Sequence, residues 1–80
     1  YDPNFYKFLA DIQRKLPRIN ANNLHICMLI RMGFLPHEIG KLMCLSPSSV
    51  TNMRKKLSQK IFSDDLAKPE KIDRFIKNIQ

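Results

Sequence analysis

Apolar residues recur at helical spacing in five segments of this chain, and no segment shows the sustained alternation that is typical of a β-strand. Prolines fall at intervals that suit the starts and stops of helices. The predicted helices cover residues 3–16, the segment from just after Asn20 to Gly33, and residues 36–43, 47–62 and 69–79. The pattern therefore predicts an all-α fold.

The start of the fourth helix is the most strongly specified boundary in the chain. Ser46 suits the N-cap, because its hydroxyl can accept a hydrogen bond from a free backbone N–H, and Pro47 suits the first helical position. Leu45 before the cap and Val50 at the fourth helical position match a hydrophobic staple. Asn20 offers the same capping chemistry to the second helix.

The fourth helix has two faces of different chemistry. At about 100° per residue, its apolar residues gather on one side; they are Val50, Met53, Leu57 and Ile61. Hydroxyl, amide and ammonium groups gather on the other side, from Ser48, Thr51, Asn52, Lys55 and Gln59. Ser, Thr and Asn are mediocre helix formers, so this polar face indicates a function beyond helix formation.

A short helix, a tight turn and a longer helix with a polar, basic face is the layout of a helix-turn-helix. Short polar groups can approach base edges, so we predict base reading by Ser48, Thr51, Asn52 and Lys55. Asn52 suits an adenine edge and Lys55 suits a guanine. We predict phosphate contacts from Ser49, Arg54, Lys56, Lys60, Lys41 and Arg31, with Arg54 and Lys56 on the flanks of the helix.

The outer helices each carry an apolar stripe that needs a partner surface. The stripes are Phe5, Phe8, Leu9, Ile12 and Leu16 on the first helix, and Ile72, Phe75, Ile76 and Ile79 on the last. Asp2 is the expected N-cap of the first helix. Lys71, Arg74 and Lys77 are expected on the solvent side of the last helix. The stripes either pack within one chain or meet their copies in a dimer; short connections favour packing within the chain.

Charge narrows the class of partner. The chain carries a net charge of +7, and between Ile12 and Ser63 nine Lys or Arg face a single acid, Glu38. This basic central part of the chain favours an anionic partner. Lysines and arginines that only solvate the surface would account for the net charge equally well. With 80 residues the chain is expected to be one domain, residues 1–80. It would comprise a three-helix core over residues 20–62 and flanking helices over 1–19 and 63–80.

Other chemistry is not indicated. There is no apolar run of about 18 residues and no signal peptide, so a cytoplasmic location is expected. Cys27 and Cys44 lie in apolar surroundings and are expected to be buried free thiols, with a disulfide between them as the less favoured alternative. His25 and His37 have no partners at metal-ligand spacing. We expect no catalysis, cofactor, metal or small-molecule substrate in this domain.

The segment from Gly33 to Val50 resembles the LuxR-type helix-turn-helix output domain. The matching positions are Glu38, Ile39, Leu42, Leu45, Ser46 and Val50, and Lys60-Ile61 resembles the closing Lys-Leu of the family. The resemblance spans about residues 20–62, and its Ser-Pro-Ser helix start is similar to regulators common in Bacteroidetes. Gly40 stands where the family usually has Ala, Ser49 replaces a Thr and Met53 replaces a frequent His.

The resemblance implies the DNA-binding end of a transcriptional regulator, with the fourth helix in the major groove. It leaves open whether two copies pair on DNA and whether the domain touches RNA polymerase. Because the chain begins at Tyr1, we expect it to be a piece of a longer regulator. Two alternatives remain: a sigma-factor-like module that reads promoters, and a protein-interaction domain whose outer helices grip a partner.

Overall fold

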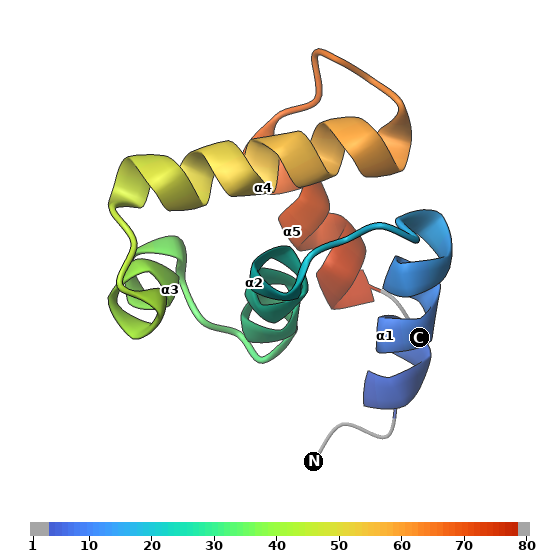
Figure 1. Cartoon of the computed structure of the whole chain (residues 1–80), viewed down its shortest axis with the longest axis horizontal. Coiled ribbons are helices and arrows are strands. Elements are labelled where there is room, and N and C mark those ends of the chain that lie inside the picture. Colours follow the sequence, from blue (N-terminus) through green and yellow to red (C-terminus); the bar gives the residue numbers. More distant parts are fainter. Residues whose placement is uncertain (1–3, 79–80) are drawn as a thin grey trace.

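The computed structural model describes residues 4–78, and every regular element in this part of the chain is a helix. The elements are α1 (Phe5–Lys15), α2 (Ala21–Arg31), α3 (Pro36–Met43), α4 (Pro47–Phe62) and α5 (Pro69–Asn78). In Figure 1, α4 lies across α2 and α3, α5 lies beside α2, and α1 stands at the outer side. The predicted all-α fold is confirmed.

Local capping explains where the central helices begin and end. The Asn20 side chain accepts a hydrogen bond from the Asn23 N–H at 2.8 Å, so α2 starts as predicted. The Ser46 hydroxyl accepts from the Ser49 N–H at 3.2 Å and fixes the start of α4. Gly33, with φ of +94°, follows the end of α2 in the left-handed region that glycine adopts without strain.

One cluster of buried side chains holds all five helices together. Its members are Phe8, Ile12, Ile26, Cys27, Leu29, Ile30, Ile39, Val50, Leu57, Ile72 and Ile76. Both outer helices contribute, because Phe8 and Ile12 from α1 and Ile72 and Ile76 from α5 are completely buried. The apolar stripes of α1 and α5 therefore pack within the chain. The predicted N-cap Asp2 and the stripe residue Ile79 lie outside the described residues.

Three expectations about individual residues are wrong. The helical spacing of Ile39, Leu42 and Met43 predicts a buried stripe on α3, but Leu42 is 58% exposed, because this short helix turns Ile39 and Gly40 inward. Cys44 is exposed, because it lies after the end of α3 with φ of +57°. Lys71 is half-buried, since its ammonium lies 4.4 Å from the centroid of the Phe62 ring.

The connection between α3 and α4 depends on Gly40. The Leu45 N–H donates to the Gly40 carbonyl at 2.8 Å, which folds the connection back against α3. A Cβ atom at Gly40 would lie 2.9 Å from the Leu45 carbonyl oxygen, closer than real Cβ atoms come to a backbone atom. Glycine at this position permits the close approach that sets α4 against α3.

Replacing Gly40 by alanine is therefore expected to lower the melting temperature. Alanine favours an ordinary helix interior by about 1 kcal/mol, but here its methyl group must displace the backbone of the connection. Thermal unfolding followed by circular dichroism measures the change. Asn22→Ala, on the exposed face of α2, is the control in which better helix propensity acts alone. A higher melting temperature for Gly40→Ala would mean that the connection adjusts freely.

Candidate nucleic-acid interface

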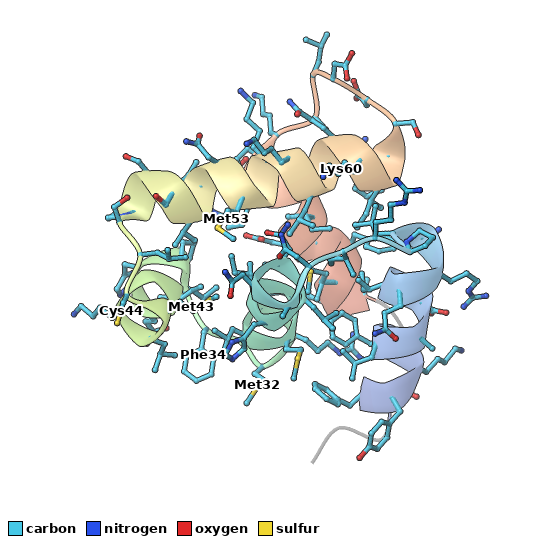
Figure 2. The ribbon with its side chains drawn as sticks, in the orientation of Figure 1. Met32, Phe34, Met43, Cys44, Met53 and Lys60 are labelled. Atoms are coloured by element: carbon cyan, nitrogen blue, oxygen red, sulfur yellow. The ribbon has the colours of Figure 1, made fainter. Side chains whose placement is uncertain are left out.

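The apolar face of α4 seats this helix on the core. Val50 and Leu57 are buried, while Met53 and Ile61 are half-buried and pack against the same cluster. Figure 2 shows Met53 on the side of α4 that faces α2 and α3. The predicted division of α4 into an inner apolar face and an outer polar face agrees with this burial. The outer face is turned to solvent along the first three turns.

The four side chains predicted to read bases share this outer face. Ser48, Thr51, Asn52 and Lys55 are all exposed. Within residues 4–78, none of these four side chains forms a hydrogen bond or an ion pair with the protein. Their donors and acceptors are therefore available to a ligand. The helix that carries them contains no Asp or Glu, so no carboxylate on α4 opposes an anion there.

The polar face ends before the last turn of α4. The Gln59 side chain donates to the Asp65 carbonyl oxygen at 2.8 Å, which ties it to the segment that joins α4 to α5. This segment rises above the C-terminal half of α4 in Figure 1 and carries the carboxylates of Asp64 and Asp65. An acidic segment there disfavours a polyanion, because like charges repel. On the outer polar face, the part open to an anion is therefore the N-terminal half of the helix.

Arg54 does not lie on the flank of α4, contrary to the prediction. Only 6% of its surface is exposed, and its guanidinium binds the Asp73 carboxylate of α5 through two nitrogens. The Nε–Oδ1 distance is 3.1 Å. The reason is angular: Arg54 lies about 40° from Val50 around the helix, inside the arc that α5 covers. Arg54 joins two helices and is not available to a phosphate.

Arg31 is likewise held by the protein. Its guanidinium donates to the Ile76 carbonyl at 2.7 Å and lies 5.6 Å from the centroid of the Phe8 ring. It therefore connects α2 to both outer helices, which leaves fewer of its donors for the predicted phosphate contact. Ser49 is half-buried, and its hydroxyl accepts a hydrogen bond from the Ser46 hydroxyl at 3.0 Å, so it serves the cap of α4.

The remaining predicted phosphate ligands are at the surface. Lys41 on α3, and Lys56 and Lys60 on α4, are all exposed. Lys56 and Lys60 are four residues apart and so lie on the same side of α4. Figure 2 shows Lys60 on the C-terminal half of α4, above the segment that leads into α2. The exposed cations thus border the polar face of α4, while the two arginines maintain the fold.

Ser58 is a residue with a structural role that sequence reasoning missed. It is completely buried, and its hydroxyl accepts a hydrogen bond of 3.0 Å from the N–H of Ile72, a residue near the start of α5. Together with the Arg54–Asp73 pair, this bond fixes α5 against the inner side of α4. The angular position of Ser58, near that of the exposed Thr51, gave no signal of this burial, because it follows from the packing of α5.

The other reactive side chains do not form a site. Burial raises the pKa of the Cys27 thiol to about 12, so it stays protonated. Within residues 4–78, no three His, Cys, Asp or Glu side chains come close enough together to hold a metal ion. No helix in the described part of the chain has the length and apolar character needed to cross a membrane.

Comparisons with known proteins return no family model, no curated protein and no solved structure that matches this chain. The resemblance to the LuxR-type domain therefore rests on its motif residues alone. Any function must be argued from the exposed chemistry of α4 and its neighbours.

Proposed function

We propose that α3, the connection through Ser46 and α4 form a helix-turn-helix, and that α4 enters the major groove of duplex DNA. One observation carries this proposal: an exposed row of short polar side chains with no partners in the described residues, on a helix without acids. An α-helix fits the major groove, where each base pair presents a distinct pattern of donors and acceptors. The N-terminal half of α4 meets both requirements.

Base reading and phosphate binding fall to different side chains in this proposal. Asn52 binds an adenine edge through both groups of its amide, and Lys55 donates to a guanine. Ser48 and Thr51 are short enough for α4 to approach the bases closely. Lys56 and Lys41, which lie outside this row, bind phosphates without regard to sequence.

The proposed role is the DNA-binding part of a transcriptional regulator, as the similarity to LuxR-type domains suggests. The sigma-factor-like alternative uses the same surface and differs in what the rest of the protein does. The protein-interaction alternative needs the apolar stripes of the outer helices to be free. Because Phe8, Ile12, Ile72 and Ile76 are completely buried in the chain itself, DNA binding is the better supported function.

Asn52→Ala and Lys55→Ala are expected to reduce the preference for a selected site over random DNA by about 1–3 kcal/mol each. Lys56→Ala is expected to weaken binding to both DNAs equally, because a phosphate contact carries no sequence information. The selected site comes from sequencing duplexes retained from a random pool, and competition assays give the two affinities. Equal losses of preference in all three variants would contradict the proposed division of labour.

A further inference from the structure

A cavity of about 390 Å³ lies beside α4, between its C-terminal half and the segment that joins α1 to α2. Its lining includes Lys15, Arg18, Asn20, Asn23, Leu57 and Lys60. Leu57 is buried and provides an apolar floor, whereas Arg18 and Lys60 are exposed at the rim. Figure 1 shows the same segment passing below the C-terminal half of α4.

The lining has the chemistry of an anion site. Lys15, Arg18 and Lys60 contribute three cations, and no Asp or Glu lines the cavity. The ammonium of Lys15 lies 5.7 Å from the centroid of the Phe75 ring, so Arg18 and Lys60 are the cations best placed for a ligand. An anion there would meet little opposing charge from the cavity walls.

The start of α2 also favours an anion at this position. The Asn20 side chain caps only the Asn23 N–H, so other N–H groups of the first turn lack intrahelical acceptors and point out of the helix. The positive end of the helix dipole adds to this potential.

We propose that this cavity binds a phosphodiester of the DNA backbone, next to the groove that α4 occupies. The inference rests on the proposed function and adds Arg18 and the start of α2 to the interface. Lys60 belongs both to the cavity and to the side of α4 that carries Lys56, so one side of α4 connects the proposed phosphate contact of Lys56 to the cavity. This continuity favours a phosphate of the bound duplex over a free phosphate ion.

The test is the salt dependence of binding to a fluorescent duplex of mixed sequence. With about four phosphate contacts, from Lys41, Lys56, Lys60 and Arg18, log K is expected to fall with log salt at a slope near −4. Arg18→Gln and Lys60→Gln are each expected to reduce the steepness of this slope by about 0.9. Lys77→Gln, at the exposed far end of α5, is the matched control and should leave the slope unchanged.

Each outcome has a distinct meaning. A wild-type slope near zero would overturn DNA binding itself, and the cavity proposal with it. A wild-type slope near −4 that neither Arg18→Gln nor Lys60→Gln changes would overturn only the cavity proposal. Titration with inorganic phosphate, followed by the amide NMR signals of Asn22 and Asn23, separates the two sources of phosphate. Saturation by free phosphate at micromolar concentration, with unchanged duplex slopes, would assign the cavity to a free ion.

Discussion

Replacing Arg54 by alanine is expected to destabilise the domain by about 3 kcal/mol, although the residue is one of three consecutive cations on α4. The side chain is buried and its guanidinium binds Asp73. Without Arg54, the Asp73 carboxylate, which is only 22% exposed, loses its partner and stays largely desolvated. A domain of this size has a total stability of about 5 kcal/mol, so the loss is a large fraction of it. Urea denaturation followed by circular dichroism measures it.

Lys56→Ala is the matched control for this experiment, because Lys56 is two residues away and exposed. It should change the stability by less than about 0.5 kcal/mol. The double substitution Arg54→Met and Asp73→Leu separates a structural role of Arg54 from a direct contact between Arg54 and DNA. It removes both charges together, so it should restore much of the lost stability and retain DNA binding. A stable double variant that no longer binds DNA would instead make Arg54 a phosphate ligand.

Features that depend on neighbours in sequence were predictable. The caps at Asn20 and Ser46, the stop at Gly33 and the first position of Pro47 are set by groups within a few residues of each other, and the structure has them where the pattern placed them. The exposure of the polar row on α4 was predictable for the same reason, because one helix has a fixed angular repeat. Local rules suffice when the interacting groups share one helix.

The roles of the two arginines depend on contacts distant in sequence. Arg54 meets Asp73 across 19 residues, and Arg31 meets the Ile76 carbonyl across 45. Sequence reasoning treated both as surface cations, which is the usual state of arginine. The helical angle of Arg54 places it just beside the apolar arc, and the position of α5 against that side of α4 follows only from tertiary packing. The cavity beside Arg18 was missed for the same reason, since three separate elements build it.

The outer helix α1 is expected to be as important for stability as the central helices. Phe8 is completely buried, its ring lies 5.6 Å from the Arg31 guanidinium carbon, and it belongs to the common core. Phe8→Ala is therefore expected to cost about 3–5 kcal/mol, which removes most of the stability of about 5 kcal/mol expected for a domain of this size. Tyr6 lies on the same helix with 83% of its surface exposed, so Tyr6→Ala is the control and should be nearly neutral.

Urea denaturation at several protein concentrations shows whether the apolar stripe of α1 is buried within one chain or against a second copy. Because Phe8 and Ile12 pack with Ile72 and Ile76 in one chain, the urea midpoint of the wild type should not change over a hundredfold range of protein concentration. A midpoint that falls on dilution would mean that a second copy covers part of the stripe, since mass action stabilises a dimer only at high concentration. A neutral Phe8→Ala variant would mean that α1 is not part of the cooperative core. The expected combination, a large loss for Phe8→Ala and a concentration-independent midpoint, requires that α1 folds within the cooperative core of a single chain.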